Sequence, residues 1–169
     1  GHTWTYGYDE VGNLISQTDA NGNPTDYEYN SKGQLTAVRD ALGHITAYAY
    51  GETGCPSCGG GGEKLTSVTD ANGRATHYHY DHSGRPIEET DPLGESISYT
   101  YDAKGNLTFK TDANGVTTNY TYDLLGRLIK KSYPDGTTEL FTYDAKGNIL
   151  TASNQHIAYA FSYDINNRV

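Results

Sequence analysis

The chain has 169 residues, a length that suits one domain, and 35 % of them are hydrophobic. A net charge of −9 and a pI of about 4.9 exclude the basic surface that nucleic acids and anionic membranes select. No apolar run approaches the length of a membrane span. Sixteen tyrosines argue against disorder, since disordered chains contain few aromatic residues. The absence of Met predicts a piece of a longer chain.

A Tyr-x-Tyr pair, in which Phe twice replaces the first Tyr, recurs from one end of the chain to the other. Its second member, here termed the anchor tyrosine, falls at Tyr8, Tyr29, Tyr50, Tyr80, Tyr101, Tyr122, Tyr143 and Tyr163. The steps between anchors are 21, 21, 30, 21, 21, 21 and 20 residues. The step of 30 equals one period plus an insertion of nine residues, at about 51–63, that contains both cysteines. Such a fixed period indicates a tandem repeat.

Each period predicts two short strands separated by turns. One strand is typified by Leu107–Thr111 and the other by Thr117–Tyr122, segments rich in the residues that strands prefer. A glycine follows most anchors by four residues, and Asn-Gly or Asp-Gly often marks the second turn, because Gly supplies the positive φ that tight hairpins require. We therefore predict an all-β fold of tandem antiparallel β-hairpins, about 21 residues each, in one long twisted sheet of about sixteen strands. The whole chain, 1–169, forms a single repeat array in this interpretation.

Side chains alternate across a strand, so both aromatic residues of each pair lie on one face of the sheet. The residue between them, such as Gly7 or Thr100, is small or polar in every case and points to the other face. A ring gives apolar contact while a hydroxyl keeps a hydrogen-bond partner, so a single sheet with this face need not enclose a dry core. The candidate binding residues are the tyrosines of the central pairs: Tyr27, Tyr29, Tyr48, Tyr50, Tyr78, Tyr80, Tyr99, Tyr101, Tyr120 and Tyr122.

The insertion contains a Cys-x-x-Cys motif formed by Cys55 and Cys58. Such a motif is compatible with a local disulfide, half of a zinc site or a redox pair. We favour a loop closed by its own disulfide, which is typical of exported proteins. A structural zinc site needs about four ligands, and only His82, in the next anchor turn, offers a weak third ligand. No cofactor is expected.

The remaining polar motifs are assigned to structure. Asp102 and Asp144, each directly after an anchor, are predicted to cap their turns through the side chain. The repeated Asp-x-Asn-Gly is assigned to a turn and not to a calcium loop, because the further oxygen ligands of an EF-hand are missing. No Ser-His-Asp arrangement or phosphate-binding loop is supported by position, so no enzymatic activity is predicted.

The turn sequence carries a family resemblance. Residues 101–107 read YDAKGNL and residues 143–149 read YDAKGNI. Tyr-Asp-x-x-Gly-x-Leu at this period resembles the YD repeat of the Rhs family, which includes bacterial Rhs and wall-associated toxins, the C components of Tc toxins, and animal teneurins. The resemblance implies a β-sheet strip that spirals into a hollow shell, which in bacterial members encloses a toxic domain until delivery. It also implies a secreted or cell-surface protein whose partners are neighbouring YD repeats and an enclosed cargo domain.

Three functions follow from these observations. The leading hypothesis is a non-catalytic structural segment of such a shell, in which each hairpin covers the edge of the next. The alternative is a carbohydrate-binding or adhesive surface, since rows of tyrosines can stack on sugar rings. A metal- or redox-responsive module at Cys55 and Cys58 is the third. Because unpaired strand edges template association, we also expect edge-to-edge self-association or a closed curl within the chain.

Overall fold

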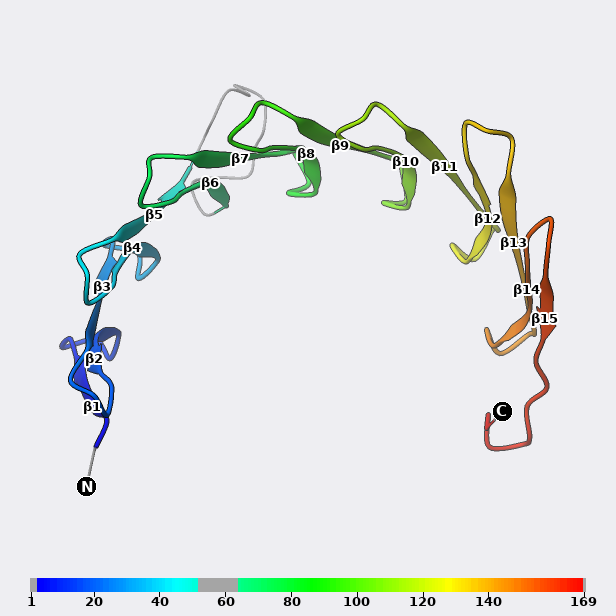
Figure 1. The fold of residues 1–169 in the computed structure, drawn as a ribbon. Helices are drawn as coiled ribbons and strands as arrows, with labels where there is room; N and C mark the ends of the chain where they lie inside the picture. The colour runs from blue at the N-terminus through cyan, green and yellow to red at the C-terminus, as the bar shows by residue number, and fades with distance from the viewer. Residues whose placement is uncertain (1–2, 52–63, 169) are drawn as a thin grey trace. The chain divides into compact units, whose positions relative to one another are not determined.

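The computed structural model describes residues 3–51 and 64–168, in which every regular element is a β-strand (Figure 1). Fifteen strands form an antiparallel sheet whose spatial order follows the sequence. This arrangement confirms the predicted array of tandem hairpins. Within the described residues, no helix has the length and apolar character needed to cross a membrane.

The chain divides into two units between Gly94 and Glu95. The first unit contains β1 (Thr5–Tyr8), β2 (Leu14–Thr18), β3 (Pro24–Tyr29), β4 (Leu35–Arg39), β5 (Ile45–Tyr50), β6 (Leu65–Thr69), β7 (Ala75–Tyr80) and β8 (Pro86–Thr90). The second unit contains β9 (Ser96–Tyr101), β10 (Leu107–Thr111), β11 (Thr117–Tyr122), β12 (Leu128–Ser132), β13 (Thr138–Tyr143), β14 (Ile149–Ser153) and β15 (Ala158–Ala160). The same hairpin recurs in both units.

The two turns of the repeat share one geometry. In the anchor turn after β1, the N–H of Asp9 donates to the carbonyl of Asn13 at 3.0 Å, and the N–H of Gly12 donates to the carbonyl of Asp9 at 3.1 Å. The turn at 19–23 makes the same two bonds, each at 3.0 Å. Its glycine has a φ of 88°, whereas Asn21 is not in the positive region. The Asn-Gly pair therefore forms a three-residue loop ending in a left-handed glycine, and not the two-residue turn that this dipeptide usually makes.

In the described residues, a β-bulge lies at the start of the second strand in each of the seven strand pairs whose first strand ends at an anchor tyrosine. Tyr8 lies opposite Leu14, while Gly7 lies opposite Ser16, so Ile15 is an extra residue on the second strand. The bulge places Leu14 on the face of Tyr8 and turns Ser16 to the other face. Simple alternation would have placed both on the same face.

The sheet is a single layer without an enclosed core. No apolar side chain in the described part of the chain is buried, and the buried residue there is Thr66, which is 5 % exposed. Its hydroxyl donates to the carbonyl of Ala49 at 3.1 Å. Stability must therefore come from contacts between neighbouring strands and repeats, as in other quasi-one-dimensional repeat proteins.

The expectation of sixteen strands is wrong by one within the described residues. The turn before β15 is one residue shorter than the others, because the N–H of Asn154 donates directly to the carbonyl of Ile157 at 2.9 Å. This shorter turn explains the final step of 20 residues between anchors. The eighth aromatic pair, 161–163, lies beyond the three residues of β15. The N–H of Phe161 still donates to the carbonyl of Leu150 at 2.9 Å, so the ladder continues on that side.

We expect the turn glycines to be required for their backbone conformation. Gly115 has a φ of 78°, and a Cβ added there would meet nothing within 4 Å, so only backbone strain opposes a substitution. Gly115→Ala should lower the free energy of unfolding by about 1–2 kcal/mol, measured by urea denaturation. Gly115→Asn should cost less, because Asn167 occupies the equivalent place at a φ of 60°. Equal stability of wild type and Gly115→Ala would contradict this account.

Candidate functional site

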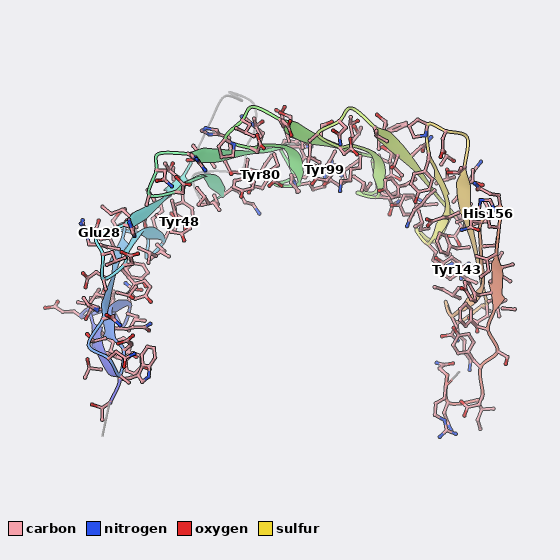
Figure 2. The ribbon with its side chains drawn as sticks, viewed as in Figure 1. Glu28, Tyr48, Tyr80, Tyr99, Tyr143 and His156 are labelled. Atoms are coloured by element: carbon pink, nitrogen blue, oxygen red, sulfur yellow. The ribbon has the colours of Figure 1, made fainter. Side chains whose placement is uncertain are left out.

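The aromatic pairs of the repeat share one face of the sheet, here termed the tyrosine face, and the opposite side is termed the polar face. Figure 2 shows Tyr48 and Tyr80 on one side of the first unit and Glu28 on the other. In the second unit, Tyr99 and Tyr143 share the corresponding face. All ten candidate binding tyrosines are half-buried, so their rings contact neighbours and also meet solvent. Ligand binding by these residues stays a prediction.

The hydroxyls of three anchor tyrosines donate hydrogen bonds to the backbone of the preceding repeat. The hydroxyl of Tyr29 donates to the carbonyl of Leu14 at 2.9 Å, and that of Tyr143 donates to the carbonyl of Leu128 at 2.7 Å. Tyr163 makes the same bond to Ile149 at 3.0 Å. Each accepting carbonyl adjoins a bulge, where the ladder is locally disrupted. This bond gives a physical reason for Tyr at these three anchors, whereas Phe occurs twice at the first position of the pair.

Basic side chains lie over several rings of the tyrosine face. A cation within about 6 Å of a ring centroid is attracted to the ring's negative face. The face is therefore a mixed aromatic and cationic surface and not a uniformly apolar one. The pairs are Lys64 over Tyr80 at 5.8 Å, Lys110 over Tyr99 at 6.0 Å, Arg127 over Tyr143 at 4.9 Å, and Lys131 over Phe141 at 5.8 Å.

The predicted capping by turn aspartates is confirmed. Oδ1 of Asp102 accepts from the backbone N–H groups of Lys104 at 2.9 Å and Asn106 at 2.8 Å, and Oδ2 accepts from the side-chain amide of Asn106 at 2.9 Å. Asp144 makes the equivalent three bonds in its own turn at 2.8, 2.9 and 2.8 Å. The side-chain amide of Asn106 holds the pKa of Asp102 below its ordinary value of 3.8. These carboxylates are committed to the turns.

The residue after the turn glycine can link one anchor turn to the next. Nε of Arg127 donates to Oδ2 of Asp123 at 2.7 Å, and Nη1 donates to the carbonyl of Asp144 in the next anchor turn at 2.8 Å. Lys104 also reaches the next turn, where Nζ donates to the carbonyl of Leu124 at 3.1 Å. Sequence reasoning misses this coupling. A sequence signal for this position is that Asn or Arg follows most anchors by five residues.

The repeat is shared with a known family. A family model described as RHS Repeat matches residues 1–24, 8–45, 29–54, 62–96, 80–110 and 101–138. The chain belongs to the RHS repeat family. Its RHS repeats cover both units, and the matches leave out residues 55–61 and 139–169. A comparison with curated proteins finds no match.

The fold is also similar to that of solved structures of Tc toxin complexes. A crystal structure of TcdB2-TccC3-Cdc42 matches with a TM-score of 0.68 and 20% identity, over 92% of this chain and 9% of that chain. A crystal structure of TcdB2-TccC3 matches with a TM-score of 0.67 and 20% identity, over 92% of this chain and 10% of that chain. A structure of the Photorhabdus luminescens Tc holotoxin pore with a TccC3 mutation matches with a TM-score of 0.64 and 21% identity, over 90% of this chain and 9% of that chain. These likenesses show the fold, and the chain spans about a tenth of the length of those chains.

The cysteine insertion interrupts the RHS repeats. Cys55 and Cys58 fall within the unmatched segment 55–61 and lie outside the described residues, so the disulfide and the weak zinc set with His82 stay predictions. Lys64, which follows the insertion, does lie against the His82 turn, since a Cβ on Gly84 would come within 3.1 Å of its Cε. Lys64 therefore lies close to the anchor turn that contains His82. Across 3–51 and 64–168, no three His, Cys, Asp or Glu side chains are grouped to hold a metal.

Proposed function

We propose that this chain is a non-catalytic wall segment of an RHS-type shell that encloses a toxin or other cargo domain. Its partners are neighbouring repeats of a longer chain and the enclosed domain, in a secreted or cell-surface protein. The RHS repeats and the fold shared with TccC3-containing complexes support this assignment. Residues 1–169 act in this proposal as one repeat array.

The observation that carries the proposal is the direction of the stabilising contacts. The Tyr143 hydroxyl reaches the carbonyl of Leu128 in the preceding repeat, and the Arg127 guanidinium reaches the carbonyl of Asp144 in the next anchor turn. Such bonds run along the sheet from repeat to repeat. A strip stabilised in this way lengthens by adding hairpins and needs no second layer. That is the property a wall requires.

The proposal predicts that the isolated chain associates through its strand edges. β1 and β15 each pair with one neighbour in the described sheet, and such edges template association. The molar mass from light scattering should rise above 18.4 kDa as the concentration increases. Lysines at the edge-strand positions Ala158 and Ala160 should reduce the rise by blocking association through β15, which leaves the edge at β1. Lysines at Thr100 and Thr121, on interior strands, should leave it unchanged.

Two outcomes would contradict the proposal. A constant mass of 18.4 kDa at every concentration would mean that the chain protects its own edges and is not a slice of a longer strip.

The proposal that the wall encloses a cargo domain is tested in a longer chain that carries these repeats. There, a domain behind the wall should resist protease until the wall unfolds. Digestion at the rate of the free domain would remove enclosure from the proposal.

A further inference from the structure

Two tyrosines lie outside the aromatic pairs that account for the other fourteen of the sixteen. Tyr133 follows β12, and Tyr159 lies in β15. The hydroxyl of Tyr133 donates to Oε1 of Glu139 at 2.8 Å, and both Glu139 and Tyr159 line one small cavity. Both tyrosines that the repeat leaves unexplained are therefore connected to Glu139, since Tyr133 bonds its carboxylate and Tyr159 lines the same cavity. The RHS repeat match ends at residue 138, directly before it.

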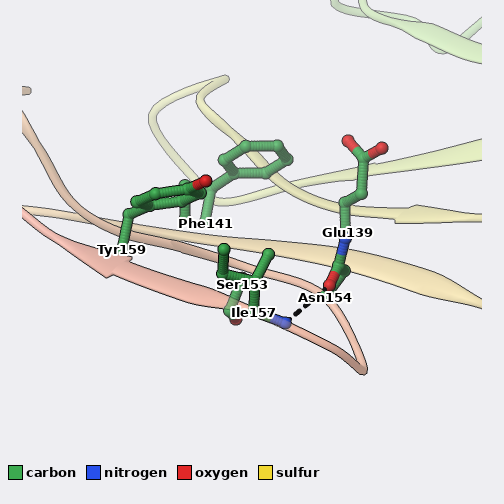
Figure 3. A pocket seen from close by; sticks show the side chains of 7 residues that line it. Glu139, Phe141, Ser153, Asn154, Ile157 and Tyr159 are labelled. Atoms are coloured by element: carbon green, nitrogen blue, oxygen red, sulfur yellow. Dashed lines mark hydrogen bonds between the residues drawn. The ribbon is translucent and has the colours of Figure 1, made fainter.

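The cavity is a slot between two aromatic rings. Phe141 pairs with Ala152, and Ala152 pairs with Tyr159, so the two aromatic residues belong to the strands on either side of Ala152. Figure 3 shows Phe141 and Tyr159 together with Ser153, Asn154 and Ile157, which also line the cavity. Strands lie about 4.8 Å apart, so a ring centred over Ala152 would lie about 4.8 Å from each neighbour, within the range of aromatic pairs. The cavity volume is about 130 Å³. A cavity of about 150 Å³ holds one benzene molecule.

Equivalent rows elsewhere have no such slot in the part of the chain that the structure describes. Each row crosses three strands and begins with the first aromatic residue of a pair. The middle residue is Gln17, Val38, Val68, Glu89, Lys110 or Lys131. In the five rows other than that of Glu89, the paired third residue is Thr25, Thr46, Thr76, Thr118 or Glu139. A longer side chain fills the middle of all six rows, and no ring is the third residue in those five rows. Among the described rows, the one from Phe141 has Ala as its middle residue and an aromatic residue on each side.

One end of the slot presents a hydrogen-bond acceptor. Glu139 lines the cavity, and its carboxylate accepts from Nζ of Lys131 at 3.0 Å and from Tyr133. The bond from Lys131, followed by that from Tyr133, holds the pKa of Glu139 below its ordinary value of 4.5, so the group is ionised at neutral pH. A carboxylate has about four acceptor sites, so these two bonds leave room for another donor.

We propose that Phe141, Ala152 and Tyr159 form a binding slot for one tyrosine side chain of a polypeptide that lies on the tyrosine face. The ring sits over Ala152, and its hydroxyl donates to Glu139. The slot holds a single ring, so the rest of the ligand must run over the open sheet, where half-buried rings and threonine hydroxyls offer contact to a peptide backbone. This inference goes beyond the wall-building function and does not depend on cargo being enclosed.

The test is an NMR titration of the whole labelled chain with N-acetyl-tyrosinamide. Chemical shifts should move at Phe141, Ala152 and Tyr159, with a Kd on the order of 1 mM for so small a ligand. Ala152→Gln should weaken binding about tenfold or more by filling the slot, and it should fold, because Gln17 occupies this place in β2. Lys110→Gln, which places the same residue at the equivalent position of another row, should leave Kd unchanged. If Ala152→Gln did not fold, Ala152→Val would replace it, since Val38 and Val68 occupy this place.

A second comparison tests the hydroxyl. N-acetyl-phenylalaninamide lacks the donor and should bind several-fold more weakly, and Glu139→Gln should reduce that preference. A peptide with one Tyr should bind more tightly than free p-cresol, whereas equal affinity would overturn a polypeptide as the ligand. Shifts spread evenly over all aromatic pairs, or undiminished in Ala152→Gln, would overturn the slot. Because the isolated chain is used, such a failure would leave the wall function untouched.

Discussion

Acidification should unfold the chain, with a melting temperature that is nearly constant between about pH 7 and pH 5 and falls steeply below about pH 4. The cause is the set of turn carboxylates, whose pKa values in the folded chain lie below the ordinary value of 3.8. A depressed folded pKa contributes stability above the unfolded pKa, and this stability is lost as the pH falls through the folded value. Circular dichroism melts across the pH series would measure it. The aspartates are Asp9, Asp19, Asp40, Asp70, Asp81, Asp102, Asp123, Asp135, Asp144 and Asp164.

The repeat itself supplies the control for this expectation. Asn30 occupies the place of the turn aspartate, and its Oδ1 accepts from the backbone N–H groups of Lys32 at 2.9 Å and Gln34 at 3.0 Å. The double variant Asp102→Asn and Asp144→Asn should therefore keep the fold at pH 7 and show a shallower acid transition. Asp26→Asn with Glu28→Gln removes two charges outside the turns and serves as the comparison. Equal acid slopes in the two double variants would show that the turn carboxylates are not the cause.

The sensitivity to acid follows from how such a sheet is held together. A globular domain of this length would hide a core of apolar side chains, whose burial does not depend on pH. Here no apolar side chain of the described residues is buried, so the turns and the bonds between repeats carry a larger share of the stability. Nearly every turn begins with Asp or Asn, and each folds a local segment that the next repeat then contacts. Loss of the turns thus removes the hairpins from which the sheet is built.

The features that sequence predicts are those that depend on local residue patterns. The period, the strands, the shared face of Tyr27 and Tyr29 and the capping by Asp102 all follow from spacing and residue type. The bulge does not, because its extra position holds residues such as Ile15 and Thr66, and β-branched residues of this kind are common throughout strands. Backbone register determines the bulge, and register is a property of two strands together.

The candidate sites show the same division. The anchor tyrosines are predictable because they repeat. The hydrogen-bond acceptors of Tyr29 and Tyr143 are not, since the accepting carbonyls lie 15 residues away in the sequence, next to a bulge. The slot at Phe141 and Tyr159 depends on a pairing across β14 that a shortened turn adjusts. A signal for it was present, because Tyr133 and Tyr159 are the tyrosines that the repeat does not explain. Departures from a repeat are thus as informative as its consensus.

Removing two anchor hydroxyls should destabilise the chain far more than removing two hydroxyls from the first position of the pairs. Tyr29→Phe with Tyr143→Phe leaves the carbonyls of Leu14 and Leu128 without their donors, and each loss should cost about 1–2 kcal/mol of unfolding free energy. Tyr27→Phe with Tyr120→Phe should cost under about 0.5 kcal/mol in total, because this position already accepts Phe in two repeats. Urea denaturation followed by circular dichroism measures both.

The comparison separates the hydroxyl from the ring. Both double variants keep every aromatic ring, so stacking and the cation of Arg127 over the ring at 143 are retained. A difference between them can then arise only from the bonds to the preceding repeat. Equal losses would mean that water replaces the anchor hydroxyls at the bulge without penalty, and the preference for Tyr at all eight anchors would need another cause. A large difference would identify the anchor hydroxyl as the bond that joins each repeat to the one before it.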